Sequence, residues 1–132
     1  MSIRVAGSVL LGTNVVIALF AADQAVRTHA SHTDIVLSST VLGELYYGAR
    51  KSRRPTSNLS RLDEFAASVA VLACDGATAQ YYGQIKDSLR LKGRPIPEND
   101  IWVAAIAIQY GLPLATRDQH FREVDGLLVE NW

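Results

Sequence analysis

The stretch that decides the fold is NDIWVAAIAIQYGLPLATRD, residues 99–118. Its first part is apolar almost all round, which predicts a helix buried at the centre of the molecule. Pro97 fits the first turn of this helix, where the missing N–H group costs nothing, and Gly111 ends the helix. The residues that follow, LPLAT (112–116), are typical of a short buried strand.

The rest of the chain repeats this alternation of strands and helices. Further strands are predicted at 8–11, 35–39 and 69–74, with a possible edge strand at 127–131. Helices are predicted from residue 15, and at 23–32, 40–51, 57–67 and 76–92. Ser39 or Thr40 is the expected cap of the third helix, and Asp75 of the fifth. Such alternation predicts an α/β fold with three layers, α/β/α, around a central parallel sheet of four to five strands.

Size and composition predict one soluble domain over residues 1–132. Hydrophobic residues make up 48% of the chain, and 13 basic residues balance 13 acidic ones. This balance excludes a strong attraction of the whole surface to nucleic acid, but it allows a local basic patch. Cys74 is the only cysteine and lies in an apolar run, so no internal disulfide forms and a cytoplasmic location is expected. No run is long enough to span a membrane.

The first 25 residues have some features of a signal peptide, with an early arginine and an apolar stretch. Gly12, Thr13 and Asn14 interrupt that stretch in its middle. A strand, a turn and the start of a helix explain the pattern better than a leader does.

Three acidic residues stand in short, distinctive settings. Glu44 lies in SSTVLGELYYG (38–48), Asp100 in IPENDIWVAAIA (96–107) and Asp118 in LPLATRDQHF (112–121). A related setting, VLLGTNVVIALF (9–20), has Gly12 where a fourth carboxylate would complete the set. Ligands of open parallel sheets gather at the carboxyl ends of the strands, so these four positions are expected to meet there. Converging carboxylates are typical of a Mg²⁺ or Mn²⁺ site.

Each acid also has an ordinary structural interpretation. Asp118 would cap a short helix, Asp100 would stabilise the first turn of its helix through the helix dipole, and Glu44 would be an exposed helical glutamate. The three acids together, in this order and context, favour the metal site.

At these residues the chain resembles the PIN-domain family, and within it the VapC-type toxins of toxin–antitoxin pairs. GTN at 12–14 corresponds to the family's strand followed by D-[TS]-N, Glu44 to its second acid, Asp100 to its third and Asp118 to its fourth, with His120 and Phe121 as the usual continuation. The resemblance implies a Mg²⁺- or Mn²⁺-dependent endoribonuclease, a cognate VapB-type antitoxin and a homodimer. It also implies that Asp100 and Asp118 are metal ligands, with Glu44 close by.

Gly12 occupies the position of the family's first metal ligand and has no side chain with which to coordinate. Thr13, which follows it, is a candidate to hydrogen-bond a metal-bound water or a phosphate. We therefore expect attenuated or absent cleavage with the fold intact.

Basic residues flank the acidic positions. Arg50, Lys51, Arg53 and Arg54 follow the Glu44 segment, Lys86, Arg90, Lys92 and Arg94 precede Asp100, and Arg117 adjoins Asp118. We expect them to hold the RNA backbone, the alternative being a solvated surface.

Several other side chains are weaker candidates. Four tyrosines are candidates to stack on bases, namely Tyr46, Tyr47, Tyr81 and Tyr82. Packing of these rings in the core or in an interface is the favoured interpretation. His29 and His32 have no acidic or cysteine partner for zinc, and His120 is a candidate to approach the acidic site.

Two functions of different kinds remain open besides a weakened endoribonuclease. One is a catalytically inactive protein that retains antitoxin or RNA binding. The other is a Rossmann-type nucleotide module, which the absence of a glycine-rich phosphate loop disfavours.

Overall fold

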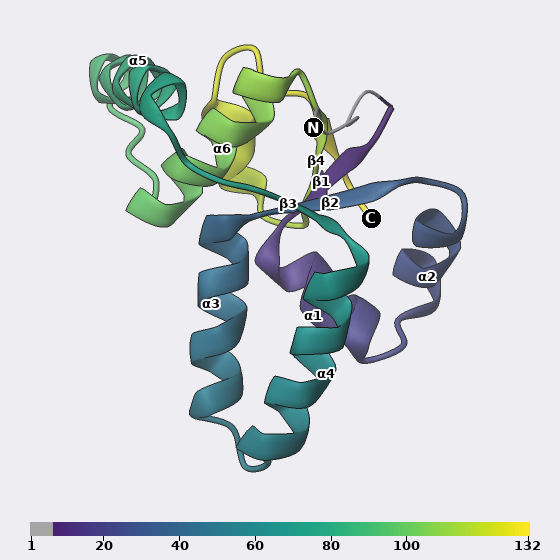
Figure 1. The fold of residues 1–132 in the computed structure, drawn as a ribbon. Helices are drawn as coiled ribbons and strands as arrows, with labels where there is room; N and C mark the ends of the chain where they lie inside the picture. Colours follow the sequence, from purple (N-terminus) through teal and green to yellow (C-terminus); the bar gives the residue numbers. More distant parts are fainter. Residues whose placement is uncertain (1–6) are drawn as a thin grey trace.

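Five short parallel strands form the centre of the structure, a computed structural model that describes residues 7–132 (Figure 1). The strands are β1 (Val9–Leu11), β2 (Ile35–Ser38), β3 (Ala70–Leu72), β4 (Leu114–Ala115) and β5 (Val129–Glu130), in the spatial order β3-β2-β1-β4-β5. Leu10 pairs with Val36 on one side and with Leu114 on the other. The strand order therefore reverses direction between β1 and β4, which is where open α/β sheets bind their ligands.

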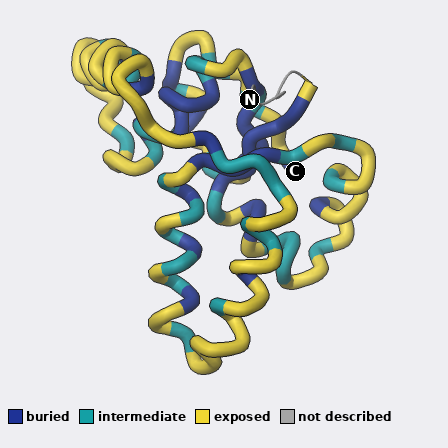
Figure 2. Tube along the Cα trace, in the orientation of Figure 1, coloured by how far each residue is buried: buried dark blue, intermediate teal, exposed yellow. Residues whose placement is uncertain are grey.

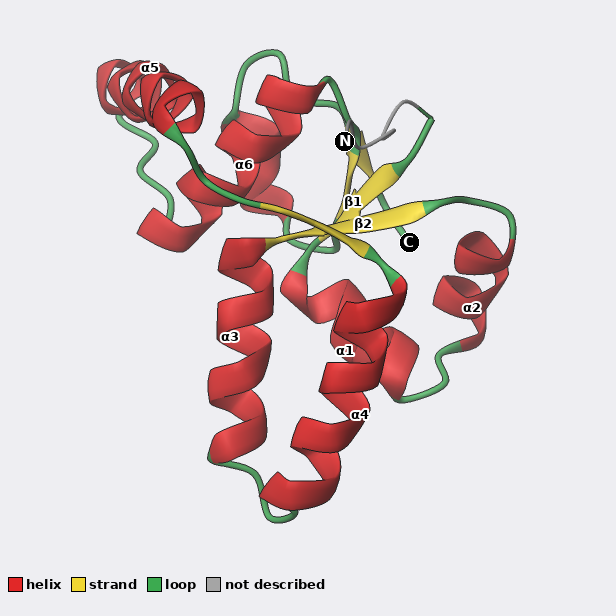
Figure 3. Ribbon diagram, viewed as in Figure 1, coloured by secondary structure: helices red, strands yellow, loops and turns green. Residues whose placement is uncertain are grey.

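Helices cover both faces of the sheet and make the three layers that the sequence predicted. They are α1 (Thr13–Phe20), α2 (Gln24–Ser31), α3 (Ser39–Arg50), α4 (Pro55–Ser68), α5 (Gly76–Lys92) and α6 (Glu98–Tyr110), followed by a short 3₁₀ helix, Gln119–Glu123. Helices α1, α3 and α4 lie on one side of the sheet, and α5 and α6 on the other (Figure 3). The predicted fold class is confirmed, and the edge strand β5 is present.

The helix caps follow the local chemistry of the chain. The Asp75 side chain accepts a hydrogen bond from the Thr78 N–H at 3.1 Å, and the Thr78 hydroxyl oxygen accepts one from the Asp75 N–H at 2.9 Å, which confirms the predicted cap of α5. Gly111 has a φ of +65° at the end of α6. The prediction for α3 was wrong by one position, because Ser38 is the residue whose hydroxyl accepts from the Val41 N–H.

Several boundaries differ from the sequence prediction, among them the starts of α1, α4 and α6. Helix α4 begins at Pro55, two residues early, because a proline suits the first position of a helix. Pro97 is the N-cap residue of α6 rather than part of its first turn. Helix α1 begins at Thr13, directly after Gly12, so that the predicted turn at 12–14 is only a bend from strand into helix. The strand and the helix start expected within the leader-like stretch are present, although residues 1–6 lie outside the described part.

The core lies on both faces of the sheet, with α6 buried on one side and apolar residues of α1, α3 and α4 buried on the other. Residues 103–107 of α6 are all buried, as are all residues of β1 (Figure 2). Strand β3 ends at Leu72, and Cys74, which was predicted to lie in this strand, is an exposed free cysteine. Within residues 7–132, no helix is long and apolar enough to cross a membrane.

Candidate active site

A pocket of about 440 Å³ opens at the carboxyl ends of β1 and β4, where the strand order reverses. Gly12, Glu44, Asp100 and Asp118, the four positions singled out in the sequence, all line it. They come from four separate segments, namely the end of β1, α3, the first turn of α6 and the residues after β4. Its other lining residues include Thr13, Asn14, Asn99, Val103, Thr116 and Phe121.

Glu44 enters the pocket from the second turn of α3, which leaves the carboxyl end of β2. The Thr13 hydroxyl donates a hydrogen bond to Glu44 Oε1 at 3.0 Å. Thr13 is the first residue of α1, so this bond joins the starts of two helices that cover the same face of the sheet. It holds the Glu44 carboxylate at the pocket and excludes the freely exposed glutamate that a helix position alone would suggest.

Asp100 lies half-buried in the first turn of α6. Its Oδ2 is 2.6 Å from the Nε2 atom of His120. Burial, as the largest effect, raises the pKa of Asp100, the His120 contact lowers it, and the charge of Asp118 raises it again, so that the net direction is upward. A site that disfavours the ionised carboxylate in this way gains from any cation that enters it.

Asp118 follows β4 and precedes the short 3₁₀ helix. Its side chain makes no capping hydrogen bond to that helix, so the ordinary interpretation of Asp118 as a helix cap is wrong. Its backbone N–H instead donates to the Thr116 hydroxyl oxygen at 3.1 Å. Thr116 is 4% exposed and is therefore a rigid support for the Asp118 backbone.

Gly12 is buried in the pocket wall and is the N-cap residue of α1, with φ of −73° and ψ of 163°. Any residue adopts this extended backbone, so the glycine is not required by local conformation. A Cβ atom built there would lie 3.2 Å from the Ala115 backbone oxygen and 3.7 Å from the Thr116 Cβ and Oγ1 atoms. Position 12 therefore accepts a side chain after a shift of a few tenths of an ångström.

The donor atoms at this pocket suit a hard divalent cation, because Glu44, Asp100 and Asp118 offer carboxylate oxygens. A fourth acid of the lining, Glu98, is paired with Lys86. Among residues 7–132, however, no three His, Cys, Asp or Glu side chains are grouped so as to hold a metal ion as they stand. The position that would bring a further carboxylate to the wall is Gly12. The residues therefore fit Mg²⁺ or Mn²⁺ in kind, with one ligand fewer than the resemblance implies.

None of the basic residues predicted to bind RNA lines this pocket. Arg50, Lys51, Arg53 and Arg54 lie at the tip of the hairpin formed by α3 and α4, which points away from the sheet (Figure 1). The others are engaged with acids: Lys86 with Glu98, Arg90 with Asp87 at 2.7 Å, Lys92 with Asp125 at 2.6 Å and Arg117 with Asp23 at 3.1 Å. Arg94 is exposed in the loop between α5 and α6.

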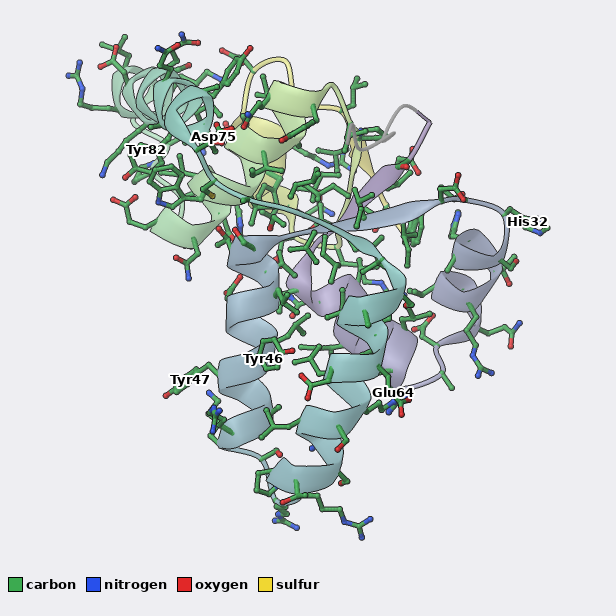
Figure 4. The ribbon with its side chains drawn as sticks, viewed as in Figure 1. His32, Tyr46, Tyr47, Glu64, Asp75 and Tyr82 are labelled. Atoms are coloured by element: carbon green, nitrogen blue, oxygen red, sulfur yellow. The ribbon has the colours of Figure 1, made fainter. Side chains whose placement is uncertain are left out.

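The tyrosines and histidines have mostly structural partners. Tyr46 donates to Asp63 at 2.5 Å, and Tyr82 stacks on Trp102 with ring centroids 4.1 Å apart. Tyr47 points outward from α3 (Figure 4) and is 67% exposed. His29 stacks on Trp132, and His32 points into solvent beyond the end of α2 (Figure 4).

Sequence reasoning missed Thr116 and Asn99 as pocket residues, and it gave His120 only a general proximity to the site. The threonine two positions before Asp118 was the available signal for Thr116, because residues two apart in an extended segment face the same side. No sequence signal indicated that His120 would contact Asp100 rather than Asp118.

An apolar groove of about 450 Å³ adjoins the acidic pocket. It lies between α1, α3 and α4 and is lined mainly by apolar side chains such as Ile17, Phe20 and Leu62. Thr13 and Glu44 line both the groove and the acidic pocket, whereas Gly12, Asp100 and Asp118 line only the pocket. Ile17 is 52% exposed on this surface.

Comparisons with known proteins agree with this geometry. Residues 9–127 match the model of the PIN domain family. The chain is 35% identical over 104 residues to Ribonuclease VapC2 of Rickettsia felis, covering 78% of each chain. It is 36% identical over 107 residues to the tRNA(fMet)-specific endonuclease VapC of Shigella flexneri, covering 80% of this chain and 81% of that protein.

Solved structures give the same relationship. The DNA-bound VapBC of Salmonella typhimurium contains a chain with a TM-score of 0.89 and 30% identity, matched over 95% of this chain and 98% of that one. VapBC2 of Rickettsia felis, bound to a DNA fragment from its promoter, gives a TM-score of 0.85 and 32% identity over 93% and 97% of the two chains. The four positions predicted for the acidic site line one pocket, and the family model and the VapC relatives match most of the chain. The chain therefore belongs to the VapC group of the PIN-domain family.

Proposed function

We propose that this chain is a VapC-type endoribonuclease toxin that depends on Mg²⁺ or Mn²⁺ and whose cleavage is attenuated by Gly12. The observation that carries the proposal is the convergence of Glu44, Asp100 and Asp118 on one pocket at the reversal of strand order. Relatives named as ribonucleases, one of them specific for tRNA(fMet), support RNA as the substrate. A cytoplasmic location fits such a substrate.

The residues of this chain prepare the pocket for a phosphodiester. Asp100 and Asp118 would hold the divalent ion, with Glu44 beside them. The chemistry that such an ion supplies when bound is activation of water and stabilisation of phosphoryl charge. Thr13 orients Glu44 through the 3.0 Å hydrogen bond, and His120 holds Asp100 at Oδ2, which leaves the other Asp100 oxygen for the pocket.

Attenuation follows from what position 12 lacks. Even the loss of a group that only supports a metal ligand costs roughly 10–100-fold in metal affinity or activity. Losing a carboxylate that itself faces the ion should cost at least that much. The fold does not depend on the missing side chain, because Gly12 has an ordinary extended backbone and donates its N–H to the Ala115 oxygen at 2.9 Å.

The partner that fits is a VapB-type antitoxin, as the VapBC complexes among the structural relatives suggest. The apolar groove between α1, α3 and α4 is a suitable surface, because burial of its apolar side chains favours association. A partner seated there would also reach Thr13 and Glu44 at the edge of the acidic pocket. The homodimer stays a prediction, to be checked by light scattering.

The test is RNA cleavage with purified initiator tRNA in the presence and absence of Mn²⁺. We expect slow or undetectable cleavage by this chain and faster, Mn²⁺-dependent cleavage by Gly12→Asp. Gly12→Asp combined with Asp118→Asn should lose the gain. Equal, metal-dependent cleavage by this chain and by Gly12→Asp would contradict the role assigned to the glycine.

A catalytically inactive protein that retains antitoxin or RNA binding is the second candidate. The observation that favours it is that no three acidic, histidine or cysteine side chains among residues 7–132 are grouped to hold a metal. An inactive Gly12→Asp variant that still binds tRNA or antitoxin would support this candidate over the first.

A further inference from the structure

The side chain of Arg117 lies on the opposite side of its segment from the acidic pocket. Thr116 and Asp118, its neighbours in the chain, line the pocket, and Arg117 does not. Its Nε–H donates to the backbone oxygen of Trp132 at 2.7 Å, and one terminal nitrogen donates to Asp23 Oδ2 at 3.1 Å. The guanidinium group therefore ties the segment that carries Asp118 to two distant parts of the chain.

Both anchors of Arg117 are themselves held in place. Asp23 is the N-cap of α2, where its other carboxylate oxygen accepts from the Val26 N–H at 3.2 Å. Trp132 is 4% exposed, stacks on His29 of α2 with ring centroids 5.0 Å apart, and donates from its indole to Glu130 at 3.0 Å. These contacts make a fixed frame out of the start of α2 and the residues around β5.

The same frame holds the preceding residue of the segment. The Thr116 N–H donates to the Glu130 oxygen at 2.9 Å, and the Thr116 hydroxyl oxygen in turn accepts from the Asp118 N–H. Thr116 and Arg117 thus tie the segment to the frame directly, and the Asp118 N–H is tied to it through Thr116. The two acceptors bond to different nitrogens of the planar guanidinium fork, Nε and a terminal nitrogen, whereas the single nitrogen of a lysine would itself have to lie within reach of both.

We propose that Arg117 is a positioning residue, which holds Asp118 in the acidic pocket through this frame, and not a contact for the RNA backbone. The proposal deepens the proposed function, because Asp118 is one of the carboxylates assigned there to the metal. Two of the N–H groups of Arg117 already have protein acceptors, and Asp23 offsets its charge. A phosphate would have to compete with both.

The first test needs no metal and no RNA. Amide hydrogen exchange of Asp118 is measured in this chain and in Arg117→Gln, with the amide of Leu10 as a reference in the core. We expect Arg117→Gln to lower the protection of the Asp118 amide by about tenfold or more while Leu10 is unchanged, and Arg117→Lys to lower it less. Arg122→Gln is the matched control, because it removes the same charge at an exposed position.

An unchanged Asp118 amide in Arg117→Gln would overturn the proposal, and so would an equal loss of protection at Leu10 and Asp118, which would mean that Arg117 only stabilises the fold. These outcomes do not depend on metal binding, so they are distinguishable from failure of the proposed function.

The second test asks whether the effect reaches the metal through Asp118. Mn²⁺ affinity, followed by paramagnetic broadening, should be roughly 10–100-fold weaker in Arg117→Gln than in this chain. In an Asp118→Asn background, Arg117→Gln should cause no further loss. An undiminished further loss there would overturn the positioning role. Absence of Mn²⁺ binding in every variant would overturn the metal site of the proposed function and leave the exchange experiment to decide the role of Arg117.

Discussion

Replacing Gly12 with aspartate is the most informative change that this chain offers. Aspartate is a favoured N-cap residue, and the backbone of Gly12 already has the extended conformation that the N-cap position of α1 requires. The new Cβ would press on the Ala115 backbone oxygen at 3.2 Å and meet Thr116 at an ordinary 3.7 Å. The new carboxylate would join Glu44, Asp100 and Asp118 at the pocket, whose remaining acid, Glu98, is paired with Lys86.

These effects on stability nearly cancel. An aspartate cap in place of glycine gains a few tenths of a kcal/mol, and the helix dipole adds roughly 0.3–1 kcal/mol. Repulsion from the other carboxylates and the close Ala115 contact act in the opposite direction. We expect the free energy of unfolding of the metal-free protein to change by less than about 1 kcal/mol. Mn²⁺ affinity, in contrast, should rise by at least roughly 10–100-fold.

The assay pairs a Mn²⁺ titration by calorimetry with urea unfolding of the same metal-free samples. Gly12→Asn is the matched control, because it has the same shape and the same capping oxygen without the charge. We expect Gly12→Asp alone to gain affinity, and Mn²⁺ to raise its unfolding midpoint more than that of the other two proteins. If Gly12→Asn binds Mn²⁺ as tightly as Gly12→Asp does, the missing charge is not what weakens the site.

Three further predictions concern other parts of the molecule. Burial and the charge of Asp118 raise the pKa of Asp100, so the ionised side chain opposes folding at pH 7, and Asp100→Asn should increase the free energy of unfolding there. The gain should shrink as the pH falls through the raised pKa of the folded state and vanish well below 3.8, where the carboxyl is protonated in both states; a gain unchanged at pH 3 would contradict this origin. Asp75→Ala should destabilise the protein by roughly 0.5–2 kcal/mol in urea unfolding, because the cap of α5 is lost, whereas Asp87→Ala on the exposed face of the same helix should cost less. Replacing all of Arg50, Lys51, Arg53 and Arg54 with glutamine should reduce the slope of log tRNA affinity against log salt concentration by about 1 for each lost phosphate contact, with Lys86→Gln as the control. An unchanged slope would show that the α3–α4 tip is not part of the RNA surface.

The parts of the site that the sequence predicted are those that depend on strand ends. Gly12 directly follows β1, Asp118 closely follows β4, and Asp100 occupies the first turn of the helix before β4, so the topology of a parallel sheet brings these positions together. The alternation of buried strands and helices was sufficient for that topology. Boundaries moved by one or two residues where Ser38, Pro55 and Pro97 took neighbouring positions of a cap or a first turn.

The parts that the sequence could not predict depend on contacts between distant residues. His120 meets Asp100 because the 3₁₀ helix after Asp118 turns it back toward α6. Arg117 finds an acceptor on Asp23, 94 positions away, and Lys92 finds one on Asp125, 33 positions away. Local pattern identifies such residues as basic and exposed, but it does not indicate whether their partner is an acid of the protein or a phosphate.

The acidic pocket and the apolar groove share two lining residues, Thr13 and Glu44, and differ in the others. Substitutions in this region are therefore of two kinds: those that alter both cavities and those that alter one. Thr13 and Glu44 line both cavities, so a substitution there would alter the proposed catalytic pocket and the proposed antitoxin surface in one step. Position 12 touches the pocket alone. Under the proposed function, a lineage that loses its carboxylate at this position can therefore lose cleavage and keep a protein that still binds whatever occupies the groove.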